Sequence, residues 1–213
     1  MKKFTPLLLI ISSIIFTALV VSFDVRPIGP NNSEVGFAVF NQAVFNMLGV
    51  HMIFYHITDW IGIIPIIFAL VYAIIGLVQL IERRSIKKVD IGLLALGVFY
   101  VIVFALYIFF NEFVINFRPI LIDNYLEASY PSSHTMIVLC LCGSAIIVNR
   151  KLIKNKRFES IVQILLIMIA LITIVGRILS GVHWATDIIG GLIIAAALLS
   201  SFRWFIDKIH SNF

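Results

Sequence analysis

The sequence predicts an all-α membrane protein with six transmembrane helices and an interfacial helical segment after the first. Hydrophobic residues make up 61% of the 213 residues, charged residues make up 13%, and the mean hydropathy is +1.08. Six apolar runs follow one another with short connections, and a transmembrane helix needs about 20 mostly apolar residues. These properties exclude a water-soluble globular protein. We expect a single membrane domain over residues 1–213.

Each apolar run is bounded by charged or turn-forming residues, which set its expected limits. The first run follows Lys2 and Lys3, as in a signal peptide, but no small-x-small cleavage site is evident, so we favour an uncleaved span. Basic clusters at residues 82–88 and 150–157 separate the second run from the third and the fourth from the fifth. The expected spans are residues 7–21, 57–80, 91–110, 134–149, 160–175 and 186–205.

The segment between the first two spans, residues 23–55, has a different pattern. Its first part, residues 26–33, is rich in the turn-forming residues Pro, Gly and Asn. Apolar side chains at helical spacing follow, namely Phe37, Phe40, Val44 and Leu48. We expect a loop and then a helix lying in the membrane interface.

The basic residues are unevenly distributed between the two sides of such a six-span chain. Thirteen Lys and Arg residues fall on the side that holds both termini, and three fall on the other. Short loops rich in Lys and Arg stay in the cytoplasm, so we expect both termini there, in a plasma or bacterial inner membrane. The three basic residues on the outer side are Arg26, Arg118 and Arg177.

Three short polar stretches at the ends of apolar runs all fall on the expected outer side. They are residues 111–119, 130–134 and 176–187, and together they contain two arginines, two histidines and an aspartate. A charge at membrane depth is costly unless it lines a polar cavity. We therefore interpret the three stretches as parts of one site that handles phosphate.

His183, Asp187 and His134 are the candidate catalytic residues. His183 and Asp187 are four residues apart at the start of a predicted helix, so their side chains share one face. A carboxylate that binds one imidazole nitrogen fixes the tautomer and makes the other nitrogen a better nucleophile. His183 is therefore expected to attack phosphorus. His134 is expected to protonate the leaving group and then to activate water, because an ordinary imidazole pKa suits both steps.

Arg118, Arg177, Ser132 and Ser133 are the candidate phosphate-binding residues. The planar guanidinium groups match phosphate oxygens in bidentate geometry. The two serines precede a predicted helix, whose free backbone N–H groups and neighbouring hydroxyls can hold an anion. The sequence contains no dense cluster of carboxylates, cysteines or histidines, so we expect no metal and no cofactor.

His51, His56 and Asp59 form a further polar group at the start of the second span. Two histidines and a carboxylate suggest a metal site, but histidines five residues apart do not share a helical face. We favour the interpretation that these three side chains are polar because they lie at the membrane–water interface. Asp59 also stands where a lipid would approach the site.

The three stretches resemble the three-part signature of the type 2 phosphatidic acid phosphatase superfamily, which includes bacterial lipid phosphatases, acid phosphatases and vanadium haloperoxidases. The family pattern is Lys-x6-Arg-Pro, then Pro-Ser-Gly-His, then Ser-Arg-x5-His-x3-Asp. Matching positions in this sequence are Arg118, Pro119, Pro131, Ser132, His134, Arg177, His183 and Asp187. The resemblance implies a metal-free phosphatase that acts on phosphorylated lipids through a phosphohistidine intermediate.

The sequence departs from the family pattern at three positions. Ser133 replaces a glycine and Gly176 replaces a serine, and both changes keep the backbone donors. Asn111 stands at the position of the family's lysine and carries no charge. The loss of that lysine weakens the stabilisation of negative charge unless another group, for which Arg26 is a candidate, replaces it.

The expected function is hydrolysis of a phosphomonoester or pyrophosphate on a membrane lipid at the extracytoplasmic face. Undecaprenyl pyrophosphate, phosphatidylglycerophosphate and phosphatidate are candidate substrates. The alternatives are a weak or inactive family member, for which Asn111 is the argument, and a protein that binds or transports lipid phosphates. Nucleic acid is not an expected partner, because the basic residues lie in short loops without interleaved aromatic residues. The sequence gives no oligomeric state.

Overall fold

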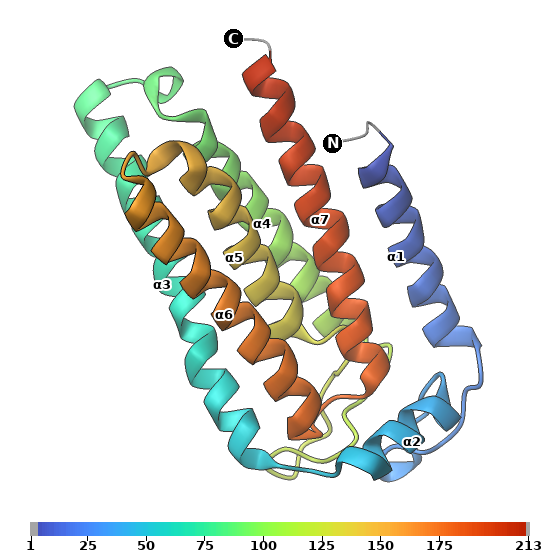
Figure 1. Ribbon diagram of the computed structural model, residues 1–213. Coiled ribbons are helices and arrows are strands. Elements are labelled where there is room, and N and C mark those ends of the chain that lie inside the picture. Colours follow the sequence, from blue (N-terminus) through green and yellow to red (C-terminus); the bar gives the residue numbers. More distant parts are fainter. Residues whose placement is uncertain (1–3, 212–213) are drawn as a thin grey trace.

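A computed structural model describes residues 4–211, and its regular elements within that range are all helices (Figure 1). Six of them are long and apolar enough to cross a membrane. The prediction of an all-α, six-span protein is therefore confirmed. The elements are α1 (Thr5–Ser22), η1 (Pro30–Asn32), α2 (Ala38–Leu48), α3 (Met52–Arg83), η2 (Ile86–Lys88), α4 (Ile91–Glu112), α5 (Ser133–Leu152), α6 (Lys156–Ser180) and α7 (Ala185–Ser211).

The two ends of the bundle differ in what they carry. Both chain ends lie at one end of the bundle, whereas α2 and the connection between α4 and α5 lie at the other (Figure 1). The short connections α3–α4 and α5–α6 lie at the end that holds the termini, and together with the helix ends that flank them they hold nine of the 16 Lys and Arg residues. The three polar stretches predicted to form a site are all at the opposite end.

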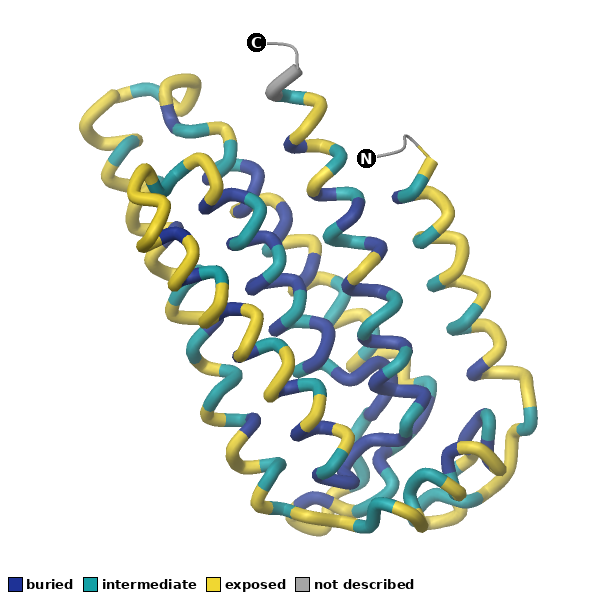
Figure 2. The backbone as a smooth tube through the Cα atoms, viewed as in Figure 1, coloured by how far each residue is buried: buried dark blue, intermediate teal, exposed yellow. Residues whose placement is uncertain are grey.

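The helices α5 and α7 form the centre of the bundle. Within their most apolar 18-residue windows, 56% of residues are buried, compared with 11% in α1 and α3 (Figure 2). A side chain at Gly143 of α5 would meet Leu199 of α7 at 2.6 Å, so glycine allows these two helices to approach closely. The helix α1 packs along α7 at the edge of the bundle.

A left-handed glycine ends α6 and places the third polar stretch. Gly181 has φ of +68°, and a Cβ there would clash with the carbonyl oxygen of Gly49. The neighbouring Ser180 carbonyl accepts a hydrogen bond from the backbone N–H of His51 at 3.1 Å. Only glycine combines this φ with this close backbone approach. The chain can therefore turn from α6 to α7 within the short segment 181–184.

The helix expected in residues 23–55 is present as α2, but its protein-facing side differs from the apolar stripe in the sequence. Phe40 is 45% exposed, whereas Asn41 is fully buried. The Asn41 amide donates to Thr186 Oγ1 at 2.9 Å, and its oxygen accepts from the Thr186 backbone N–H at 3.1 Å. A polar side chain thus joins α2 to the first turn of α7. Contact of α2 with a membrane interface stays a prediction.

The connection between α4 and α5, residues 113–132, folds back on itself. Arg118 donates its backbone N–H to the Glu127 carbonyl at 3.0 Å, and Trp184 Nε1 donates to the Phe117 carbonyl at 2.8 Å. These bonds tie the first polar stretch to the later part of the connection and to the residue that follows His183. Hydrogen bonds of the connection itself therefore bring Arg118 towards the end of α6.

Candidate active site

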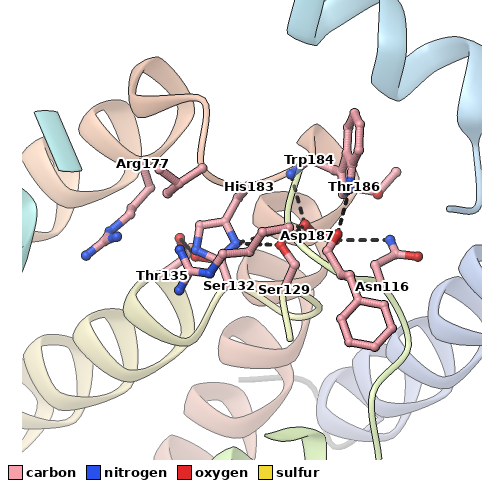
Figure 3. Close-up of polar contacts among 12 residues, drawn as sticks. Asn116, Ser129, Ser132, Thr135, Arg177, His183, Trp184, Thr186 and Asp187 are labelled. Carbon is pink, nitrogen blue, oxygen red and sulfur yellow. Dashed lines mark hydrogen bonds and ion pairs between the residues drawn. The ribbon is translucent and has the colours of Figure 1, made fainter. Parts of the chain in front are cut away.

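The predicted site residues come together at the end of the bundle opposite the termini, although six different parts of the chain supply them. Figure 3 shows Arg177, His183, Asp187 and Ser132 grouped around one region. Asn111 lies in the last turn of α4, and Arg118 lies in the connection 113–132. The start of α5 carries Ser132, Ser133 and His134. Arg177 lies in the last turn of α6, His183 lies in the turn that follows, and Asp187 lies in the first turn of α7.

His183 and Asp187 are close, but a third residue links them. His183 Nδ1 lies 3.9 Å from Asp187 Oδ2, which is too long for a hydrogen bond. The hydroxyl of Ser129 lies between them, 2.9 Å from His183 Nδ1 and 2.5 Å from Asp187 Oδ2 (Figure 3). All three residues are buried. The sequence analysis expected a direct pair and did not identify Ser129.

The carboxylate of Asp187 is held by three donors besides any contact with His183. The backbone N–H of Trp184 donates to Oδ2 at 2.9 Å, and the Ser129 hydroxyl donates to the same oxygen at 2.5 Å. Asn116 Nδ2 donates to Oδ1 at 3.2 Å (Figure 3). A buried carboxylate needs such partners to stay ionised. This network fixes the position of the acidic group before any substrate binds.

The second imidazole nitrogen of His183, Nε2, is buried and has no hydrogen-bond partner within residues 4–211. Burial lowers the pKa of His183 well below its usual value of 6.5, and the positive charges of Arg118 and Arg177 lower it further. His183 is therefore a neutral imidazole at neutral pH. With Nδ1 engaged by Ser129, Nε2 carries the free lone pair.

The two arginines are buried, and each combines one acidic partner with unengaged donors. Arg118 is 8% exposed and its Nε lies 3.0 Å from Glu127 Oε2. Arg177 is fully buried, and its Nη2 is paired with Asp59 Oδ1. Arg118 Nη1, Arg177 Nε and Arg177 Nη1 are buried without a hydrogen-bond partner in the described part of the chain. Buried guanidinium donors in this state favour an anion.

Asp59 of α3 joins the site from outside the three polar stretches. Its Oδ1 pairs with Arg177 and also lies 3.1 Å from His134 Nε2. Across the described residues, no group of three His, Cys, Asp or Glu side chains is arranged to hold a metal. The sequence offered one clue that Asp59 belongs to the site, because it is a carboxylate near the outer end of an apolar span.

Ser132, at the start of α5, was expected to bind phosphate, but its backbone N–H and its hydroxyl both make hydrogen bonds within the protein. The backbone N–H of Ser132 donates to the Asp187 carbonyl at 3.0 Å, so it is not free to bind phosphate. The Ser132 hydroxyl accepts from Thr135 Oγ1 at 3.0 Å, while Ser133 lines the cavity described next. Ser132 thus ties α5 to α7.

A cavity of about 460 Å³ opens beside His183. The connection 113–132 contributes most of its apolar part, and α4 adds two aromatic side chains. Its polar part consists of Asn111, Arg118, Glu127, Ser129, Ser133 and His183. The lining residues are Tyr107, Phe110, Asn111, Val114, Phe117, Arg118, Leu126, Glu127, Ala128, Ser129, Tyr130, Pro131, Ser133, Met136 and His183. Asn111 is thus beside the site, whereas Arg26 is not among the lining residues and pairs with Asp24 at 2.7 Å.

Comparison with known structures identifies a similar fold. A crystal structure titled the first transmembrane PAP2 type phosphatidylglycerolphosphate phosphatase from Bacillus subtilis aligns with 97% of this chain and 98% of its own, at 20% identity and a TM-score of 0.59. This likeness concerns the fold. No curated protein matches the sequence.

Comparison with protein families gives the wider relationship. The PAP2 superfamily matches residues 91–210, which extend from α4 into α7 and include every position of the three-part signature. The match covers more than half of the chain and confirms the resemblance seen in the sequence. The chain therefore belongs to the PAP2 superfamily.

Proposed function

We propose that this protein hydrolyses a phosphomonoester or pyrophosphate group on a membrane lipid through a phosphohistidine intermediate. The observation that carries the proposal is the neutral His183, whose buried Nε2 has no partner among the described residues while two arginines lie near enough to lower its pKa. A nucleophile beside buried, unengaged guanidinium donors suits attack on a phosphate.

The reaction assigns a role to each group. The lone pair of His183 Nε2 forms a bond to phosphorus, and the bond from phosphorus to the lipid oxygen breaks with its electron pair. His134 gives a proton to the departing oxygen, then takes a proton from a water molecule that attacks phosphorus. The N–P bond breaks and inorganic phosphate leaves. Arg118 and Arg177 stabilise the phosphate oxygens throughout.

A lipid is the favoured substrate class because of what surrounds the cavity. Tyr107, Phe110, Val114 and Met136 give the cavity an apolar part next to the polar one. The cavity adjoins α4, which is one of the six apolar helices, so a lipid tail can stay in the bilayer while its headgroup reaches His183. The basic residues at the opposite end of the bundle support an extracytoplasmic site in the plasma or bacterial inner membrane.

The alternative of a weakly active or inactive family member rests on Asn111. Its uncharged side chain lines the cavity where the family signature has a lysine, so the transition state has one cation fewer. A loss of this kind costs on the order of 10²–10³ in rate when an oxyanion contact is removed. A weakly active or inactive member, or a lipid-phosphate carrier, would share the same fold and cavity.

The test is phosphate release from detergent-purified protein with EDTA present. Undecaprenyl pyrophosphate, phosphatidylglycerophosphate, phosphatidate and diacylglycerol pyrophosphate form the panel, with wild type, His183→Ala and His56→Ala. His56 is exposed at the same end of the bundle and serves as the matched control. We expect turnover in wild type and His56→Ala and none in His183→Ala. Folded wild type that releases no phosphate would contradict the proposal and make Asn111→Lys the next variant.

A further inference from the structure

Ser129 is a buried hydroxyl inside the site that neither the sequence motifs nor the proposed reaction assigns a role. It is 2% exposed and lies just before the second polar stretch. Its backbone N–H donates to the Asn116 carbonyl at 2.8 Å, and the Asn116 side chain in turn donates to Asp187. Both the backbone and the side-chain oxygen of Ser129 are therefore held relative to the Asp187 carboxylate.

The distances fix the direction of the hydrogen bonds through this hydroxyl. A serine hydroxyl has one proton to donate and two lone pairs to accept. At 2.5 Å from Asp187 Oδ2, a carboxylate oxygen that can only accept, the proton must point to Oδ2. The hydroxyl oxygen then accepts from His183 Nδ1, 2.9 Å away, which must carry the imidazole proton. This tautomer leaves Nε2 without a proton.

We propose that Ser129 is a positioning residue that carries the influence of the Asp187 carboxylate to His183 and selects the tautomer with a free Nε2. The proposal rests on the proposed function, because Nε2 is the atom that attacks phosphorus. It replaces the direct histidine–aspartate contact with a three-membered chain, Nδ1–H to Oγ–H to Oδ2. The 3.9 Å separation between imidazole and carboxylate requires such a bridge.

The chain matters most when the phosphohistidine forms. Bonding of Nε2 to phosphorus gives the imidazole a positive charge, while the proton stays on Nδ1. The bond from Nδ1–H to the Ser129 hydroxyl then becomes charge-assisted, and the hydroxyl is polarised by the carboxylate behind it. The contribution of Ser129 is therefore larger in the transition state than in the resting enzyme, so it raises kcat more than it lowers KM.

The charged groups around His183 make a pH measurement informative. Arg118 from the connection 113–132, Arg177 from α6 and His134 from α5 all lower the pKa of His183, whereas the backbone of Ser129 raises it. Asp187 faces it from α7 through the Ser129 hydroxyl. Replacement of Ser129 by alanine keeps the backbone contact and removes only the link to Asp187. The imidazolium then loses an acceptor, and the acid limb of kcat/KM shifts to lower pH.

The experiment compares Ser129→Ala, Asp187→Asn and the double variant with wild type in the phosphate-release assay. Ser144→Ala is the matched control, because Ser144 is a fully buried serine within α5 that donates to the Cys140 carbonyl at 2.6 Å. We expect Ser129→Ala to lower kcat about 10- to 100-fold, as the loss of an outer partner of a functional histidine does, with KM changed less than about twofold. The double variant should be no slower than Asp187→Asn alone.

The outcomes separate this proposal from the proposed function. Two outcomes would overturn the bridging role while the phosphatase function stands. In the first, wild type turns over and Ser129→Ala keeps full activity. In the second, the decrease in kcat of the double variant equals the product of the decreases in the two single variants. No turnover by wild type would overturn the function. In that case vanadate, which mimics the phosphoryl transition state, decides on Ser129: we expect Ser129→Ala to bind it about tenfold more weakly than Ser144→Ala, and equal binding would refute the bridge.

Discussion

At the scale of single residues, His183 shows how burial and charge cooperate. Burial alone favours the neutral imidazole, and the nearby guanidinium groups add to this preference instead of opposing it. The same arginines that we propose to bind phosphate thus keep the proposed nucleophile unprotonated. The Asp187 carboxylate does not contact the imidazole directly and is joined to it through the Ser129 hydroxyl.

This electrostatic arrangement predicts the acid side of the pH profile. The proposed reaction needs a neutral His183 in the free enzyme. Because its pKa lies well below 6.5, protonation should abolish activity only at pH values well under 6.5. The measurement is kcat/KM for phosphate release from about pH 4 to about pH 9, which reports ionisations of the free enzyme. An acid limb centred at or above 6.5 would contradict a depressed pKa at this residue.

Asp59 gives a second prediction at this scale. Its carboxylate occupies an Arg177 donor that would otherwise bind phosphate, and it also holds His134 Nε2. Asp59→Asn should therefore lower KM, by about tenfold for a charged hydrogen bond on the order of 1.5 kcal/mol, and should also lower kcat because His134 loses its orienting partner. Steady-state kinetics tests both effects. The control is Asp123→Asn, an exposed carboxylate in the connection 113–132, and an unchanged KM in Asp59→Asn would argue against competition with substrate.

At the scale of elements, the short turn between α6 and α7 decides whether the site forms. It depends on Gly181, whose left-handed φ and close contact with Gly49 exclude a side chain. Because His183 follows two residues later, strain at Gly181 is transmitted directly to the proposed nucleophile.

Gly181→Ala should therefore destabilise the fold and reduce activity together. The left-handed conformation alone costs about 1–2 kcal/mol for an L-residue, and the clash with the Gly49 carbonyl adds to it. Gly97→Ala in α4 is the control, because no atom lies within 4 Å of the place its new methyl group would take and alanine favours helix. Thermal unfolding in detergent should show a lower Tm for Gly181→Ala only. Equal Tm values would show that the turn relaxes without cost.

The sequence predicts elements and motif residues better than it predicts their partners. Long apolar runs determine the six spans, because an apolar helix is the form that satisfies backbone hydrogen bonds in lipid. Asn41 was not predicted to face the protein, because helical spacing favoured its apolar neighbours. Ser129 was not identified, and Asp59 was assigned to the membrane interface and the lipid approach instead of to Arg177. Both roles depend on contacts with residues 54 to 118 positions away.

At the scale of the whole molecule, the topology can be tested with single cysteines. Cys140 and Cys142 are at most 1% exposed, so they should give no background labelling. Tyr125→Cys lies at the site end and Glu82→Cys at the end that holds the termini. We expect a membrane-impermeant maleimide to label Tyr125→Cys in intact cells and Glu82→Cys only after the membrane is opened. The reverse pattern would place the site in the cytoplasm.

The pairing of α1 with α7 has a consequence for how the protein is made. These are the first and last of the described helices, and α1 packs along α7 at the edge of the bundle. During synthesis, α1 enters the bilayer long before its partner and waits there with its packing face against lipid. Since α7 also carries Asp187, the same late event closes the bundle and adds the last residue of the candidate active site. A chain that ends before α7 would therefore lack both Asp187 and the helix on which α1 packs.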